Sequence, residues 1–168
     1  KDMQDTLPIH FAPLQGYTEA IYRNAHDAFF GGVDTYYTPF VRLEKGNFRR
    51  RDVRGIEPEN NGVPHLIPQL IASSAEKAEV ILSLFIEKGY QEVDINLGCP
   101  FPLLAKRHNG SGILPYPEEV KALLSIVTRY PQISFSVKMR LGWEQPDECL
   151  ALAPILNDLP LRQITMHP

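Results

Sequence analysis

Segments with the character of strands and of helices alternate along this sequence, and that alternation narrows the possible folds most. Apolar and β-branched stretches typical of strands are separated by stretches whose apolar residues recur at helical spacing. Strands that alternate with helices form a parallel sheet covered by helices. The sequence therefore predicts an α/β fold with about four helices and six strands, the strands at residues 7–14, 33–41, 65–71, 92–97, 133–139 and 162–167.

The expected helices have recognisable start signals. Thr18 is expected to cap the first helix, and Ser73 with Glu76 forms a possible capping box for the second. Pro117 is expected to open the third helix, because proline is favoured at the first helical position. The fourth helix is expected to run from about Asp147.

Two architectures fit this order: an open doubly wound sheet and a (β/α)8 barrel of the TIM type. No G-x-G-x-x-G follows the first expected strand and no P-loop is present, which weakens the dinucleotide-binding open sheet. A full barrel needs at least about 200 residues, and this sequence has 168. The sequence therefore predicts either an open sheet or an incomplete barrel with about six of its strands.

The composition excludes several classes of protein. There are 17 Lys and Arg against 20 Asp and Glu, a net charge of −3, which argues against nucleic-acid binding by bulk charge but allows a local basic groove. No apolar run approaches the roughly 18 residues of a membrane span, and no signal peptide is recognised. Two cysteines are too few for a secreted disulfide framework. We therefore expect a cytoplasmic protein without a membrane partner.

Polar residues gather where the expected strands end. In parallel α/β folds the carboxyl ends of the strands form the ligand site. A lysine, an arginine and a histidine beside two amides suit an anionic or electron-rich ring better than a metal, since no H-E-x-x-H, C-x-x-C or carboxylate cluster is present. We therefore expect a polar pocket without a metal, built from Gln69, Asn96, Lys138, Arg140 and His167.

Cys99 lies just after a strand end, between Gly98 and Pro100. This position indicates an exposed thiol on a rigid turn. A thiol is mostly protonated at neutral pH, so it can donate a proton, or attack as a thiolate where its pKa is depressed. Cys149 lies on an apolar helix stripe instead, and we expect it to be a small buried residue.

Two basic segments are candidates for contacts with phosphate. Four arginines lie between residues 49 and 54, within a polar stretch at 44–64 that we expect to be a long irregular loop. Residues 106–108 are Lys-Arg-His and precede the glycine-containing stretch 109–112, where the backbone can approach a ligand closely. A solvated surface is the alternative interpretation of the arginine cluster.

At this point the residues resemble a known family, the tRNA-dihydrouridine synthases. The similarity follows the order of the chain over nearly its whole length, and the pair N-x-G-C-P and V-K-x-R-x-G is its most specific part. The segments that carry it are Ala12-Pro13-Leu14, Pro39-Phe40-Val41-Arg42, Gln69, Asp94-Ile95-Asn96-Leu97-Gly98-Cys99-Pro100, Gly110-Ser111-Gly112-Ile113-Leu114, Val137-Lys138-Met139-Arg140-Leu141-Gly142 and the strand that ends in His167.

The resemblance implies an FMN-dependent oxidoreductase that reduces the C5=C6 bond of uridines in tRNA, with NADPH reducing the flavin. It implies an FMN-binding (β/α)8 barrel followed by a helical tRNA-binding domain. By position, Gln69 would hydrogen-bond the flavin ring and Lys138 would lie near its N1–C2=O edge. The other flavin contacts implied by the resemblance are Pro13, Leu14, Gln15 and His167.

The resemblance also implies roles on the substrate side. Asn96 would hold the uracil, with Arg140 as a second substrate-binding residue. Cys99 would protonate C5 while hydride from reduced FMN reaches C6. The target base must leave its stack to enter such a pocket, so contacts with RNA are expected beside it.

The sequence departs from the family pattern in three ways. Leu14 stands where methionine is usual, and Pro168 follows His167 where Gly or Ala is common. The phosphate-binding loops after the seventh and eighth strands, and the tRNA-binding domain, have no counterpart. We therefore expect residues 1–168 to be a partial FMN-binding barrel from a longer protein, contacting tRNA through the absent C-terminal domain and the basic loops. The alternatives are another FMN barrel such as a dihydroorotate dehydrogenase, and a non-catalytic RNA-binding fragment.

Overall fold

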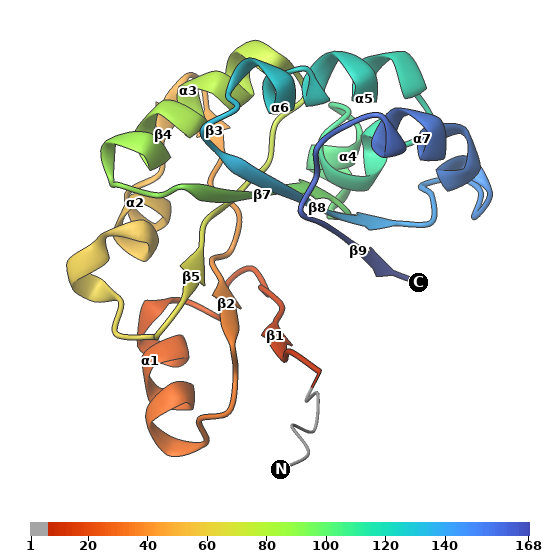
Figure 1. Cartoon of the computed structure of the whole chain (residues 1–168). Coiled ribbons are helices and arrows are strands. Elements are labelled where there is room, and N and C mark those ends of the chain that lie inside the picture. The colour runs from red at the N-terminus through yellow and green to blue at the C-terminus, as the bar shows by residue number, and fades with distance from the viewer. Residues whose placement is uncertain (1–6) are drawn as a thin grey trace.

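The computed structural model describes residues 7–168, in which parallel strands and helices alternate along the chain (Figure 1). Residues 1–6 of the expected domain lie outside this part. The strands are β1 (His10–Phe11), β2 (Thr35–Tyr37), β3 (Leu43–Glu44), β4 (Asn47–Phe48), β5 (Leu66–Ile67), β6 (Gln69–Leu70), β7 (Glu92–Leu97), β8 (Ser134–Arg140) and β9 (Gln163–His167).

The helices are of unequal length, and two of the helical segments are short 3-10 turns. None of the helices between residues 7 and 168 is long and apolar enough to cross a membrane. The helical segments are α1 (Ala20–Phe29), α2 (Arg50–Ile56), η1 (Pro58–Asn60), α3 (Ala75–Glu87), α4 (Pro102–Ala105), η2 (Gly110–Ile113), α5 (Pro117–Leu124), α6 (Ile126–Arg129) and α7 (Glu148–Asn157).

The parallel strands pair in the order in which they occur in the sequence. One sheet has the order β1–β2–β5 and the other the order β6–β7–β8–β9, while β3 and β4 form a separate antiparallel hairpin. Pro68 interrupts one extended segment between β5 and β6, so its first half pairs with β2 and its second half with β7. The prediction of an α/β fold with parallel strands is confirmed, and these strands show no reversal of order like that of a doubly wound sheet.

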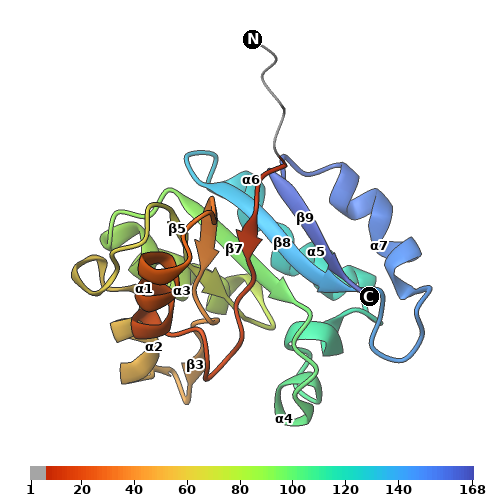
Figure 2. The ribbon, with the colours of Figure 1, turned by 90° about the horizontal axis from the view of Figure 1, so that it is seen from below.

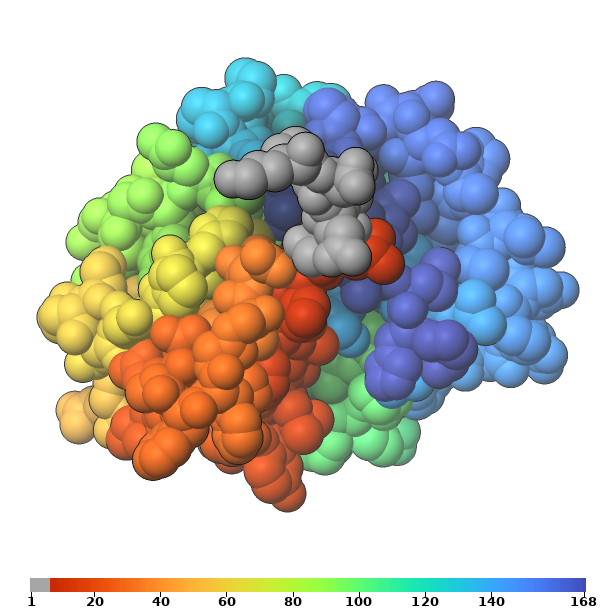
Figure 3. Space-filling view, turned by 60° about the horizontal axis from the view of Figure 1, so that its bottom comes forward, coloured from red at the N-terminus to blue at the C-terminus, as the bar shows by residue number. Residues whose placement is uncertain are grey.

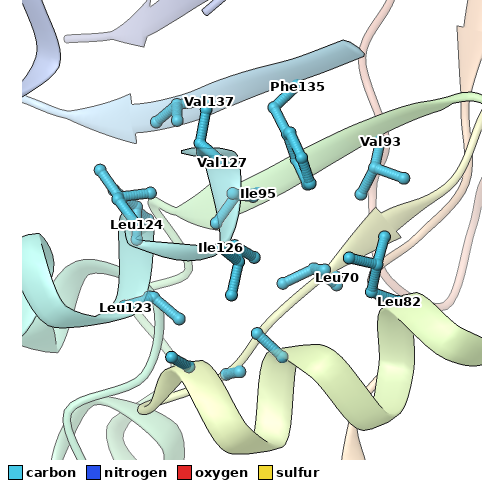
Figure 4. Close-up of a cluster of buried hydrophobic side chains, with 14 of the residues drawn as sticks. Leu70, Leu82, Val93, Ile95, Leu123, Leu124, Ile126, Val127, Phe135 and Val137 are labelled. Atoms are coloured by element: carbon cyan, nitrogen blue, oxygen red, sulfur yellow. The ribbon is translucent and has the colours of Figure 1, made fainter. Parts of the chain in front are cut away.

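The hydrophobic core lies between the helices and one face of β7 and β8. Figure 1 shows α3, α5, α6 and α7 together on this side of the two strands. Alternate strand residues such as Ile95 and Val137 are fully buried there against Leu82 and Leu123 of the helices (Figure 4). Because side chains alternate along a strand, the remaining residues of β7 and β8 point to the opposite face.

A buried arginine joins the first helix to the last turn of α2 and to Asn61, which follows η1. Nη1 of Arg23 donates to the carbonyl oxygen of Thr18 at 2.6 Å, and Nη2 donates to the Gly55 carbonyl at 2.8 Å and to Oδ1 of Asn61 at 2.6 Å. Burial lowers the pKa of Arg23 to about 10. The guanidinium thus holds three separate segments through hydrogen bonds rather than through an ion pair.

The structure corrects several expected boundaries. The first two strands are shorter than expected, and Glu19 rather than Thr18 is the N-cap of α1, because the Thr18 hydroxyl is bonded to the backbone of Leu14. Ser74 rather than Ser73 caps α3, accepting from the Lys77 amide at 3.4 Å. The irregular loop expected at 44–64 is wrong, since this stretch contains β4, α2 and η1.

Candidate active site

The carboxyl ends of the parallel strands surround a cavity of about 500 Å³. Figure 2 shows the segment after β1, the strand β3 and the helix α4 below the strands, on one side of the molecule. Figure 3 looks toward the hollow between the red N-terminal and blue C-terminal parts of the chain. All nine residues that the sequence predicts for the site line this cavity: Pro13, Leu14, Gln15, Gln69, Asn96, Cys99, Lys138, Arg140 and His167.

Strand register explains why residues distant in the sequence meet here. Asn96 of β7 pairs with Lys138 of β8, which pairs in turn with Thr165 of β9. Two residues further along, Arg140 pairs with His167. Parallel strands in register place equivalent positions side by side, so these polar residues form successive rows across one face of the sheet.

A second row of polar residues lies deeper, and of its members only Gln69 lines the cavity. It crosses three strands at Gln69, Asp94 and Ser136, all of which are buried. Nε2 of Gln69 donates to Oδ2 of Asp94 at 2.7 Å, and the Ser136 hydroxyl donates to Oδ1 of Asp94 at 2.5 Å. Nδ2 of Asn96 then donates to Oε1 of Gln69 at 2.9 Å, which connects the deep row to the row that lines the cavity.

The turn that carries Cys99 is held by hydrogen bonds from several directions. Oδ1 of Asn96 accepts from the amides of Gly98 and Cys99 at 3.0 and 2.9 Å. The carbonyl oxygen of Cys99 accepts from the amide and hydroxyl of Ser111 at 3.0 and 2.9 Å. Gly110 has a φ of +61°, and a methyl group added there would lie 2.6 Å from that same carbonyl oxygen. The backbone of Cys99 therefore occupies one tightly defined position.

Positive charge collects on the strand ends that line the cavity. Burial lowers the pKa of Lys138, with Arg140 acting in the same direction and Asp94 opposing both. Arg140 and Lys138 together lower the pKa of His167. Among the described residues Lys138 has neither an ion-pair partner nor a hydrogen bond from its ammonium group, which leaves the group able to bind an anionic or electron-rich ligand.

The basic segments lie outside the cavity lining. Arg49 forms two hydrogen bonds of 2.8 Å with the buried Asp52, which leaves Arg50, Arg51 and Arg54 as the exposed members of that cluster. His108 stacks on a tyrosine and bonds to a glutamate, whereas Lys106 and Arg107 are exposed. Residues 7–168 contain no cluster of three or more His, Cys, Asp or Glu side chains that could hold a metal ion.

Sequence reasoning assigned no role in the site to Asp94 or Ser136. The alternation of side chains along a strand could have found both, because it places Asp94 on the same face as Asn96 and Ser136 on the same face as Lys138. What the sequence pattern does not contain is the pairing of β6 with β7, which brings Gln69 next to Asp94.

Comparison with known proteins shows the family to which the chain belongs. The family model described as dihydrouridine synthase matches residues 10–168. A probable tRNA-dihydrouridine synthase 1 of Synechocystis sp. is 28% identical over 163 residues, which cover 93% of this chain and 44% of that protein. The tRNA-dihydrouridine(16) synthase of Haemophilus ducreyi is 28% identical over 176 residues, covering 95% and 51%.

A tRNA-dihydrouridine synthase B of Klebsiella pneumoniae is 29% identical over 100 residues, which cover 59% of this chain and 31% of that protein. The chain thus spans about half or less of the length of these curated relatives. Because the family model matches nearly the whole chain, from the first strand to the last residue, the chain belongs to the dihydrouridine synthase family.

Proposed function

We propose that this chain is part of an FMN-dependent oxidoreductase that reduces the C5=C6 bond of uridines in tRNA to dihydrouridine. The observation that carries the proposal is the position of Cys99 at a cavity lined by three side-chain amides, two cationic side chains and a histidine, in a chain of the dihydrouridine synthase family. The relatives with the best coverage are named tRNA-dihydrouridine synthases.

The residues of the cavity fit FMN. The volume of the cavity, about 500 Å³, lies in the range of small-molecule sites. Oε1 of Gln15 is buried without a hydrogen-bond partner, and Lys138 is a half-buried cation without one, so both can bind a polar ring. The residues that would hold FMN are Pro13, Leu14, Gln15, Gln69, Lys138 and His167. When bound and reduced by NADPH, FMN supplies the hydride for the reaction.

The residues of the chain supply the other requirements of the reduction. Addition of a hydride at C6 of the base must be balanced by a proton at C5, and the Cys99 thiol holds that proton. Asn96 and Arg140 orient the uracil beside this thiol. The hydrogen bonds to the Cys99 turn keep the thiol in place while the base enters. Exposed Lys106 and Arg107, with the arginines of α2, bind phosphates around the base, which must leave its stack.

The strand order supports a barrel as the architecture. Six consecutive parallel strands without a reversal match the first six of a (β/α)8 barrel, in which β1 and β9 would pair with strands from the rest of the protein. α1 and its C-cap also expose Ile21, Phe29 and Phe30, an apolar surface that a further helix of a barrel would cover. A helical tRNA-binding domain would follow the barrel. We expect the protein in the cytoplasm.

The test uses the full-length protein that contains this chain. The purified protein is expected to retain FMN and to form dihydrouridine in unmodified tRNA with NADPH. Cys99→Ala is expected to retain FMN but to lose at least about 100-fold in rate, the size of a general-acid contribution. Cys149→Ala is the matched control, expected to keep the native rate. Turnover of dihydroorotate instead of tRNA, or a Cys99→Ala variant with native activity, would contradict the proposal.

A further inference from the structure

Among residues 7–168, Asp94 is the one carboxylate buried beneath the cavity, in the middle of β7. Its side chain is 2% exposed and does not line the cavity itself. A buried charge is costly unless it is fully hydrogen-bonded. Burial raises the pKa of Asp94, whereas the bonds from Ser136 and Gln69 and the nearby Lys138 lower it. The position therefore calls for an explanation beyond packing.

The hydrogen bonds of Asp94 impose a direction on Gln69. A carboxyl oxygen that carries no proton can only accept hydrogen bonds. Ser136 donates to one oxygen of Asp94 and Nε2 of Gln69 donates to the other, at 2.5 and 2.7 Å. The amide nitrogen of Gln69 must therefore face Asp94, and its carbonyl oxygen must face away, toward Asn96.

The same direction passes from Gln69 to Asn96. Oε1 of Gln69 accepts from Nδ2 of Asn96 at 2.9 Å, so Oδ1 of Asn96 points to the next turn. There it accepts from the backbone amides of Gly98 and Cys99, which can only donate. This series of hydrogen bonds thus begins at an acceptor, the carboxyl group of Asp94, and ends at two donors, the backbone amides of Gly98 and Cys99. Reversing either amide would set donor against donor or acceptor against acceptor.

We propose that Asp94 is a positioning residue, which sets the amide directions of Gln69 and Asn96 and thereby the placement of Cys99. After the internal bonds, Gln69 retains one N–H and one lone pair for a ligand, and Asn96 retains one N–H. Asp94 thus determines which donors and acceptors the cavity offers without touching the ligand. The ligand side of this inference rests on the proposed function, whereas the placement of Cys99 does not.

The first test compares two variants of the full-length protein in its flavin-free form. Asp94→Asn preserves the size of the side chain but offers both a donor and an acceptor, so the direction of Gln69 is imposed only from the Asn96 side. Its Cys99 is expected to react with iodoacetamide at least threefold faster, measured by peptide mass spectrometry with Cys149 as the internal reference. Ser136→Ala removes the other bond to Asp94 but leaves the carboxylate, so Cys99 is expected to react at the native rate.

A charge-relocation variant separates positioning from stability. In the double variant Asp94→Asn with Gln69→Glu, the carboxylate at position 69 accepts from both neighbours, so Asn96 keeps its direction. The alkylation rate of Cys99 is expected to return to within twofold of native. FMN affinity is expected to be at least tenfold weaker than in the native protein, because position 69 no longer offers an N–H. Gln69→Met, which breaks the chain of bonds while leaving Asp94 in place, is expected to speed alkylation as Asp94→Asn does.

Two results would overturn the inference. One is an unchanged rate of Cys99 alkylation in both Asp94→Asn and Gln69→Met. The other is a rate that rises equally in Ser136→Ala and Asp94→Asn and follows their loss in thermal unfolding temperature, which is the pattern of a purely structural residue. Alkylation is measured without flavin or tRNA, so its result is valid even if the protein fails to reduce tRNA. A failure of this inference can therefore be distinguished from a failure of the proposed function.

Discussion

Nε of Arg140 donates to the carbonyl oxygen of Gly98 at 2.9 Å and thereby ties the end of β8 to the turn that follows β7. The same arginine lines the cavity and pairs in register with His167. One side chain therefore connects the position of the Cys99 turn with the charge of the neighbouring strand ends.

Replacing this arginine by lysine tests the connection. Arg140→Lys preserves the charge but loses the planar guanidinium, so the bond to Gly98 is expected to be lost. The free energy of unfolding should fall by about 1 kcal/mol, as for one hydrogen bond, and Cys99 should be alkylated several-fold faster than in the native protein. Arg162→Lys, remote from the turn, is the control. Equal alkylation rates in the two variants would contradict the role of Arg140.

A substitution at Gly110 tests the close approach of this residue to the backbone of Cys99. Gly110→Ala places a methyl group 2.6 Å from the Cys99 carbonyl oxygen, at a φ of +61°. Gly89→Ala is a matched control, with a φ of +86° and no atom within 4 Å of the added methyl group. The control should lower the free energy of unfolding by about 1–2 kcal/mol, from the backbone conformation alone. Denaturant titration should show a larger loss for Gly110→Ala, and a smaller loss would mean that the turn yields readily.

Lys138 is expected to reduce the stability of the flavin-free protein. Burial lowers its pKa below the ordinary value of 10.5, so the unfolded chain binds this proton more tightly than the folded chain does. The penalty is complete below the folded-state pKa and is relieved as the pH rises toward 10.5. Lys138→Met should raise the midpoint of thermal unfolding at pH 7 by a few degrees, and the gain should shrink as the pH rises. A lower midpoint at pH 7 would contradict this account.

Arg23, in contrast to Lys138, is expected to stabilise the folded protein. Its guanidinium bonds to Thr18, Gly55 and Asn61, so truncation leaves the buried Thr18 carbonyl and Oδ1 of Asn61 without this donor, whereas the Gly55 carbonyl keeps a bond from Nδ2 of Asn61. Arg23→Met should lower the free energy of unfolding by about 2–4 kcal/mol. The exposed Arg54→Met provides the comparison, with an expected change within about 0.5 kcal/mol. Similar losses in the two variants would show that the buried bonds contribute little.

The polar residues at the strand ends were predictable because side chains alternate between the two faces along each strand. Alternation of side chains along β8 places Lys138 and Arg140 on the face opposite the apolar core residue Val137, and the structure has them so. The nine site residues could be assembled from this rule together with the family resemblance. Their roles in binding and catalysis stay predictions.

Other features depend on contacts that a local pattern does not contain. Helix α2 has no apolar repeat, and Asp52 and Ile56 are buried only because the surrounding chain packs over them. The position of Cys99 depends on Ser111 and Arg140, which come from a later turn and the next strand. Asp94 occupies a polar position of the alternating strand β7, and only the pairing with Gln69 and Ser136 reveals its partners.

The interruption at Pro68 separates two groups of parallel strands that are paired to different extents. β7 and β8 are paired along Glu92–Leu97 and Ser134–Met139, whereas β1, β2 and β5 are joined by only two register pairs at each interface. Sparse pairing lowers the free energy of local opening. The sparsely paired strands therefore support the cavity wall that contains Pro13. The extensively paired β7 and β8 support the wall that contains Lys138. A ligand that touches both walls should therefore slow amide exchange mainly at Tyr36 and Thr38, whose amides donate between β2 and the segment of β5, so that exchange in the sparsely paired strands reports on occupancy.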